Sequence, residues 1–222
     1  QGHSEVVRLL IDGGAAVNQA MVDGGTIAVI TPLYLAAYKG HTEIVRLLIG
    51  GGAALDHTTK DDGETPLYTA AERGHADVVT LLVSSGAAVN QARMDNGETP
   101  VYSAAGRGHA EVVSLLVAGG ATLDQATKSN GATPLYIAAQ QGYTKVVGLL
   151  IDGGATVDQA TTDHSITALL VAAQHGFTEV VRLLIGAGAA VNKAVSQARA
   201  DNGVTPIFFA AQQGHTEVVR LL

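Results

Sequence analysis

The sequence predicts an all-α fold: an α-solenoid of helix-turn-helix units joined by β-hairpin or turn loops. Three markers recur in register along its 222 residues. A Thr-Pro-Leu-Tyr motif or a variant recurs at spacings of 34, 34, 34, 34 and 38 residues, and a Gly-His or Gly-aromatic pair follows nine residues after each Thr. A Gly-Ala-x-x-Asn/Asp motif closes each unit. Self-similarity at such a period is typical of stacked repeats. The first marker starts at Thr31, Thr65, Thr99, Thr133, Thr167 and Thr205.

The closing Asn or Asp of each unit defines the repeat boundaries. Five full repeats result, flanked by two partial ones, and we expect all of them to form a single domain over 1–222. The full repeats are 19–56, 57–90, 91–124, 125–158 and 159–192, and the partial ones are 1–18 and 193–222.

The first helix of a repeat can be derived from repeat 57–90. Thr65 is a suitable N-cap, and Pro66 fits the first helical position, where its missing N–H costs nothing. Ala70 and Ala71 extend an apolar stripe along one helical face, and their small size permits close approach of a neighbouring helix. Gly74 is expected to end the helix in the left-handed conformation.

The second helix of the same repeat carries Val78, Val79 and Leu82 and is expected to end near Gly86. The Asn96-Gly97 pair that follows predicts a β-turn at a hairpin tip. Segments 19–30 and 193–204 are four residues longer than their equivalents, so we expect longer tips there. Neither helix can bury its stripe alone, so the stacking of repeats must supply the core.

The consensus T-P-L-Y-x-A-A-x-x-G-H-x-E-V-V-x-L-L resembles the ankyrin repeat along essentially the whole chain. Its period here is 34 rather than 33 residues, and Tyr34 and its equivalents replace the usual His, so the family's His-centred hydrogen bonding is not assumed. Repeat 159–192 has lost Pro at Ala168, Tyr at Leu170 and the turn Gly at Ser165. We expect that repeat to be the weakest locally.

Composition excludes several classes of protein. The chain has no Cys, which removes disulfides, thiol catalysis and Cys-type zinc sites. Its net charge of −7 argues against general binding to nucleic acid, and no apolar run is long enough to cross a bilayer. No signal peptide is visible at the first residues, so we expect an intracellular location.

The residue types that could carry chemistry follow the repeat instead of breaking it. Five of the eight His occupy the Gly-His position, which favours hydrogen bonding in the turn between helices. His57, His164 and His175 lie singly, without a partner at metal-ligand spacing. The Gly clusters follow helices, where the partial negative charge of a helix C-terminus repels phosphate. We therefore expect no catalytic residue, no cofactor and no metal.

The resemblance implies that the variable positions of the first helices and the hairpin tips form a concave surface for a protein partner. Tyr and Arg dominate binding hot spots, which favours Tyr38, Arg73, Arg93 and Arg107; the alternative that these residues are merely solvated stays open. The full set of predicted partner-binding residues is Tyr38, Lys39, Glu72, Arg73, Arg93, Glu98, Arg107, Gln140, Gln141, Gln174 and His175.

The sequence thus predicts a non-catalytic scaffold for protein–protein interaction. The alternative is a targeting or substrate-recruitment module of a larger multidomain enzyme or signalling protein, and an active site within the array is a third, disfavoured hypothesis. Residues 1–10 match 213–222 except at Ser4 against Thr216, so both ends fall inside a repeat without a polar cap. From this we expect either a piece of a longer array or disordered flanking residues, and the uncapped apolar ends could also stack head to tail between chains.

Overall fold

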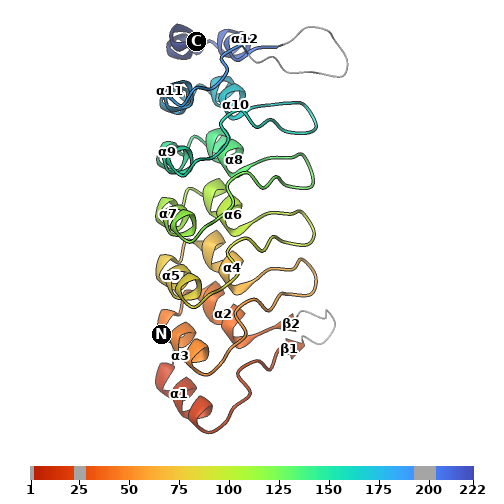
Figure 1. Ribbon diagram of the computed structural model, residues 1–222, viewed down its shortest axis with the longest axis vertical. Coiled ribbons are helices and arrows are strands. Elements are labelled where there is room, and N and C mark those ends of the chain that lie inside the picture. The colour runs from red at the N-terminus through yellow and green to blue at the C-terminus, as the bar shows by residue number, and fades with distance from the viewer. Residues whose placement is uncertain (1–2, 23–28, 193–203) are drawn as a thin grey trace. The chain divides into compact units, whose positions relative to one another are not determined.

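The computed structural model describes residues 3–22, 29–192 and 204–222. These residues form thirteen helices and one pair of short strands (Figure 1). The elements are α1 (Ser4–Asp12), β1 (Met21–Val22), β2 (Val29–Ile30), α2 (Pro32–Lys39), α3 (Thr42–Gly50), α4 (Pro66–Arg73), α5 (Ala76–Ser84), α6 (Pro100–Gly106), α7 (Ala110–Ala118), α8 (Pro134–Gln141), α9 (Thr144–Asp152), α10 (Ala168–His175), α11 (Thr178–Gly186), α12 (Pro206–Gln212) and α13 (Thr216–Leu221).

The first helix α4 begins and ends as its sequence predicts, whereas at α12 the Thr205 side chain makes no cap hydrogen bond. The Thr65 hydroxyl accepts a hydrogen bond from the Tyr68 backbone N–H at 3.0 Å, and Pro66 occupies the first turn. Gly74 then ends α4 with φ of 77°, a left-handed conformation in which a side chain would be strained. The same N-cap forms at α2, α8 and α10, so α10 keeps its start although Ala168 replaces the proline.

The chain divides into two compact units: unit 1, Gln1–Ala104 with Ser114–Ala121, and unit 2, Ala105–Val113 with Thr122–Leu222. In unit 1, the first helices α2 and α4 pack side by side, and the second helices α1, α3 and α5 form a parallel row (Figure 1). Unit 2 repeats this arrangement with α8, α10 and α12 in one row and α9, α11 and α13 in the other. The interpretation of the whole chain as a single domain stays a prediction.

The core of each unit lies between its two rows of helices. In unit 1, Leu33, Ala37, Leu67 and Leu82 are fully buried. A buried leucine contributes roughly 1.5–3 kcal/mol, and the alanines let adjacent first helices approach closely. Stacking of repeats therefore supplies the core, as the sequence predicts.

The longer hairpin of repeat 19–56 contains β1 and β2, which pair antiparallel with Met21 opposite Ile30. This pairing confirms the predicted hairpin. Residues 23–28 of this long segment and residues 193–203 of the second one, for which a longer tip is also predicted, lie outside the described residues.

Candidate interaction surface

Four of the predicted partner-binding residues lie at the ends of the first helices of unit 1. Tyr38 and Lys39 end α2, and Glu72 and Arg73 end α4. The guanidinium carbon of Arg73 lies 3.6 Å from the centroid of the Tyr38 ring, and the Lys39 amine lies 5.5 Å from it. Lys39 and Arg73 are exposed while Tyr38 is half-buried, so the structure brings two cations together on one aromatic ring.

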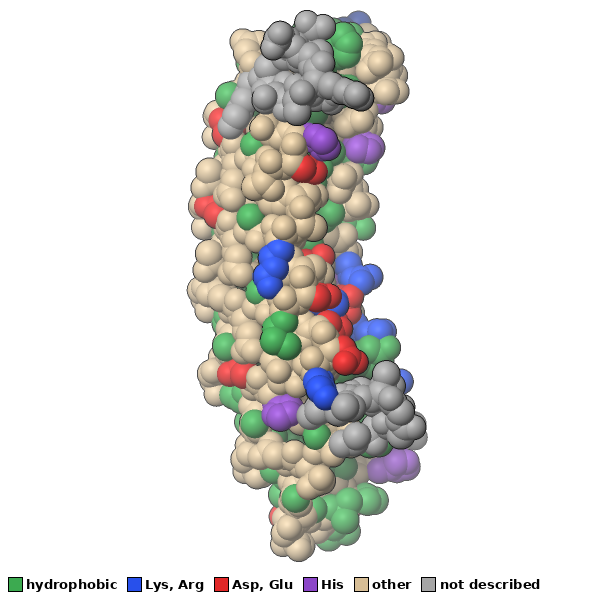
Figure 2. Space-filling view, turned by 90° about the vertical axis from the view of Figure 1, so that its right-hand side faces the viewer, with side chains coloured by type: hydrophobic (Ala, Val, Ile, Leu, Met, Phe, Trp, Pro, Cys, Tyr) green, Lys and Arg blue, Asp and Glu red, His purple; other side chains and the backbone are tan. Residues whose placement is uncertain are grey.

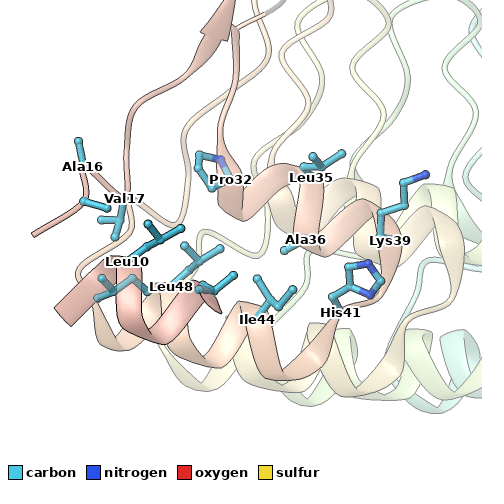
Figure 3. A pocket seen from close by; sticks show the side chains of 13 residues that line it. Leu10, Ala16, Val17, Pro32, Leu35, Ala36, Lys39, His41, Ile44 and Leu48 are labelled. Carbon is cyan, nitrogen blue, oxygen red and sulfur yellow. The ribbon is translucent and has the colours of Figure 1, made fainter. Parts of the chain in front are cut away.

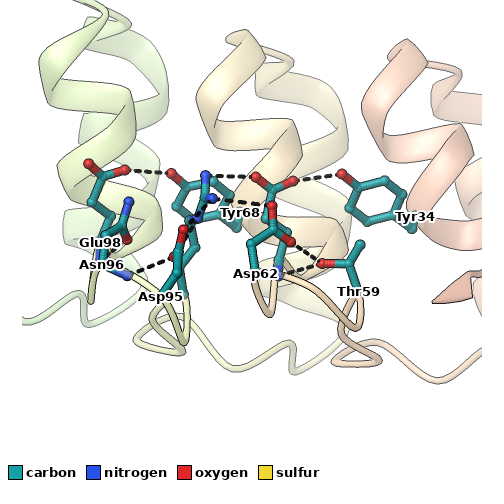
Figure 4. Close-up of polar contacts among 9 residues, drawn as sticks. Tyr34, Thr59, Asp62, Tyr68, Asp95, Asn96 and Glu98 are labelled. Carbon is teal, nitrogen blue, oxygen red and sulfur yellow. Dashed lines mark hydrogen bonds and ion pairs between the residues drawn. The ribbon is translucent and has the colours of Figure 1, made fainter. Parts of the chain in front are cut away.

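Arg93 lies at the centre of a polar network that joins two hairpin tips of unit 1 (Figure 4). Its Nη1 lies 2.9 Å from Glu64 Oε1, and its Nη2 lies 3.2 Å from Asp62 Oδ2 and 2.8 Å from Asp95 Oδ2. Its side chain is only 18% exposed. The structure thus gives Arg93 an intramolecular role that sequence reasoning missed.

Two tyrosines extend this network onto the first helices. The Tyr34 hydroxyl donates to Glu64 Oε2 at 2.6 Å, and the Tyr68 hydroxyl donates to Glu98 Oε2 at 2.9 Å (Figure 4). Tyr34 and Tyr68, which occupy the position usually held by His in this motif, therefore each form a side-chain hydrogen bond to a Glu. The sequence contained a signal for these Tyr–Glu hydrogen bonds, because Glu precedes the Thr-Pro pair only at Glu64 and Glu98.

Burial and neighbouring charges set the protonation equilibria in this network. Burial raises the pKa of Glu64, against the opposing effect of the hydrogen bond from Tyr34. The hydrogen bond from Arg93 lowers the pKa of Asp95. Burial also raises the pKa of the Tyr34 and Tyr68 hydroxyls, so both are protonated donors at neutral pH.

Charge is distributed unevenly between the hairpin tips of the two units. Tips 57–64 and 91–98 of unit 1 carry five carboxylates and two cations, a net charge of three negative. The Asp, Glu, Lys and Arg residues of tips 125–132 and 159–166 in unit 2 are limited to Lys128 and Asp163. Figure 2 shows acidic and basic side chains lying next to one another on the face that bears the tips.

The predicted residues of unit 2 differ in exposure. Arg107, Gln141 and His175 are exposed, whereas Gln140 and Gln174 are half-buried. His175 is held locally, because its Nδ1 lies 2.9 Å from the carbonyl oxygen of Val171 and its ring stacks on Phe177 at 5.7 Å.

Histidines at the Gly-His position link consecutive repeats within each unit. The Nε2 atom of His75 lies 3.2 Å from the Tyr38 carbonyl oxygen, and that of His215 lies 3.0 Å from the Gln174 carbonyl oxygen. A structural role is thus shown for these two histidines, but their hydrogen-bond partner lies in the preceding repeat and not in the turn between the helices of their own repeat. Among the described residues, no cluster of three or more His, Asp or Glu side chains has the geometry to hold a metal ion.

An apolar cavity of about 420 Å³ opens between α1, α2 and α3 (Figure 3). Leu10, Val17, Leu35 and Ile44 line it, together with Lys39. Leu35 is 47% exposed, whereas its equivalents Thr69 and Val171 are 0% and 2% exposed. Sequence reasoning identified apolar ends but did not locate this cavity.

A family model described as ankyrin repeats (3 copies) matches three segments of the chain, 1–93, 86–163 and 158–222. Together the three matches span the chain from end to end. No curated protein matches the sequence. Within the described ranges, no helix has both the length and the apolarity that crossing a membrane requires.

Proposed function

Because the chain belongs to the ankyrin repeat family, whose repeats generally serve as protein–protein interaction modules, we propose that it is a non-catalytic scaffold that binds a protein partner through its first helices and hairpin tips. The single observation that carries this proposal is the Tyr38–Arg73 contact. It displays an aromatic ring and two cations on a row of rigid helices.

Preorganisation is the physical basis of such binding. Helices α2, α4, α8, α10 and α12 each start at a threonine N-cap or a proline, and each packs against a neighbouring first helix of its unit. A partner therefore meets a backbone that is already ordered, so little backbone entropy is lost on binding. Tyr and Arg, the residue types most enriched at binding hot spots, are present at the exposed ends of these helices.

A capture experiment tests the proposed surface. The full chain is immobilised and used to select binders from a displayed library of protein fragments. The variant Tyr38→Ala/Arg73→Ala/Arg107→Ala is expected to lose the selected binders. The control Arg8→Ala/Arg46→Ala/Arg182→Ala, which changes second-helix arginines that are 55–58% exposed, is expected to keep them. Retention of the binders by the first variant would show that another face is used.

Self-association is a second candidate, favoured by apolar side chains that the described residues leave exposed. Leu9 and Leu10 of α1 are 63% and 58% exposed, and Phe208 of α12 is 54% exposed. Exposed apolar patches of this kind often mark interaction sites. Sedimentation velocity at increasing concentration tests this candidate: oligomers that disappear in Leu9→Glu/Leu10→Glu support it, and a monomer at every concentration rejects it.

A further inference from the structure

Two clusters of opposite charge lie on the same face of unit 1. The acidic cluster consists of the five carboxylates at its hairpin tips: Asp61, Asp62, Glu64, Asp95 and Glu98. The basic pair consists of Lys39 and Arg73, at the C-terminal ends of α2 and α4. The clusters thus occupy opposite ends of the first helices.

Two stacked tyrosines of α2 connect the acidic cluster to the basic pair. The Tyr34 hydroxyl contacts Glu64 at 2.6 Å, and the Tyr34 and Tyr38 ring centroids lie 6.5 Å apart. Tyr38 in turn carries Arg73 on its ring at 3.6 Å. These contacts form a continuous chain from the Glu64 carboxylate through two aromatic rings to the Arg73 guanidinium.

The charges of this surface are only partly neutralised from within. Arg93 pairs with three carboxylates, and Lys60 is the one further cation of the two tips, so three negative charges remain in excess. Glu72 precedes Arg73 and offsets one positive charge, and its field also raises the pKa of Glu64. The half charges at helix ends have the opposite sign to these side chains but are smaller.

We propose that this face of unit 1 recognises a charge-segregated partner segment, with Lys or Arg at one end over the acidic cluster and Asp or Glu at the other end over Lys39 and Arg73. This inference rests on the proposed function and specifies the chemistry of its partner. The eight residues of α2 span about 12 Å, which an extended segment covers in about four residues. The two charged ends are therefore separated by about four residues.

Charge complementarity is expected to select this segment mainly by rejecting others. A segment with one sign of charge places like charges over one of the two clusters, which is costly at an interface. A segment with alternating charges places both signs over each cluster and gains little from either. The tyrosine rings between the clusters provide apolar contact area for the uncharged middle of the segment.

Three fluorescent peptides of equal length test the inference by anisotropy with the full chain at low salt. The first has two lysines and two glutamates separated by four uncharged residues, the second has the same composition with alternating charges, and the third carries only lysines. We expect the segregated peptide to bind at least about tenfold more tightly than the alternating one. We also expect this preference to weaken as salt is added.

Variants of the chain assign the preference to this face. Lys39→Glu/Arg73→Glu makes the face acidic throughout, so the preference for the segregated peptide is expected to disappear while the lysine-only peptide binds more tightly. The control Arg46→Glu/Arg182→Glu alters the same number of charges on second helices and is expected to retain the preference. Circular dichroism checks that each variant is folded.

Three outcomes overturn the inference: equal affinity for the segregated and alternating peptides, a preference that survives Lys39→Glu/Arg73→Glu, or no binding of any peptide. None of them rejects the proposed function, which is tested by the capture experiment with folded fragments. The proposed binding surface is instead rejected if the selected binders still bind the variant Tyr38→Ala/Arg73→Ala/Arg107→Ala.

Discussion

Arg93 and Glu64 belong to hairpin tips of consecutive repeats, and their side chains meet at 2.9 Å with exposures of only 18% and 12%. The equivalents of Arg93 in other repeats are Thr59, Thr127 and Thr161, whose hydroxyls bond within their own tips. In repeat 91–124, Asn96 accepts the hydrogen bond from the backbone N–H of Glu98 instead. Arg93 is thereby available to join its tip to the preceding one.

Replacement of Arg93 by alanine is expected to destabilise the chain by about 1–3 kcal/mol. The loss is large for a tip residue because it leaves Asp62, Glu64 and Asp95 without their shared cation in a half-buried site. Urea denaturation followed by circular dichroism measures the change. Arg46→Ala is the matched control: its ion pair with Glu43 joins side chains that are both 58% exposed, so a change within about 0.5 kcal/mol is expected. Equal costs for the two variants would contradict the role of Arg93.

Glu64 is expected to make stability depend on pH in the opposite sense to an ordinary ion-paired carboxylate. Burial raises the pKa of Glu64 above its usual value of about 4.5, so the folded chain binds this proton more tightly than the unfolded chain. The contribution of Glu64 to stability therefore falls as pH rises from 4.5 through the folded-state pKa, and is regained on acidification.

The comparison with Glu64→Gln isolates this effect, because the amide introduced by the substitution does not titrate while Asp95 and all other acids remain in both proteins. The stability of the unmodified chain minus that of Glu64→Gln is expected to increase as the pH is lowered from 7 to 5. Urea titrations of both proteins at each pH measure it. A difference that stays constant or decreases on acidification would reject the assignment of the raised pKa to Glu64.

The sequence was sufficient to predict the repeated elements of the fold because they depend on local chemistry. The Thr65 N-cap, the proline after it and the left-handed Gly74 each act within a few residues of their own position. The exposed i, i+3 pair of Glu179 and Arg182 also follows from helix geometry alone, with the two side chains 3.3 Å apart.

The contacts of the candidate surface could not be predicted in the same way. Tyr38 meets Arg73, and Tyr34 meets Glu64, across about one repeat, at distances set by how neighbouring repeats pack. The sequence identified Arg93 as a surface residue, but its burial by carboxylates of the preceding tip depends on three-dimensional placement. Periodicity fixes which positions face outward and leaves their partners undetermined.

Close packing between repeats predicts unequal costs for two glycine substitutions in unit 2. Gly142 and Gly154 both have positive φ, at 74° and 92°, so alanine is strained at either. A Cβ at Gly142 would also lie 2.9 Å from the Phe177 ring, whereas at Gly154 it would meet nothing within 4 Å. Gly142→Ala is expected to cost about 1–3 kcal/mol more than Gly154→Ala in urea denaturation. Equal costs would show that the Phe177 ring moves aside freely.

Repeat 159–192 is expected to be strengthened by restoring its turn glycine. Ser165 has φ of 56°, a conformation in which a residue with a Cβ is strained, and its equivalents Gly63, Gly97 and Gly131 have φ of 73–76°. Ser165→Gly is therefore expected to stabilise the chain by up to about 1 kcal/mol, since relief of strain exceeds the added entropy of the unfolded state. The reciprocal Gly131→Ser should destabilise by more, because a Cβ there would lie 2.9 Å from the backbone nitrogen of Thr162. Urea denaturation of both variants measures these shifts in the free energy of unfolding. A Ser165→Gly protein that is less stable than the parent would contradict the prediction, because the contacts of the serine side chain would then stabilise the fold by more than its backbone strain costs.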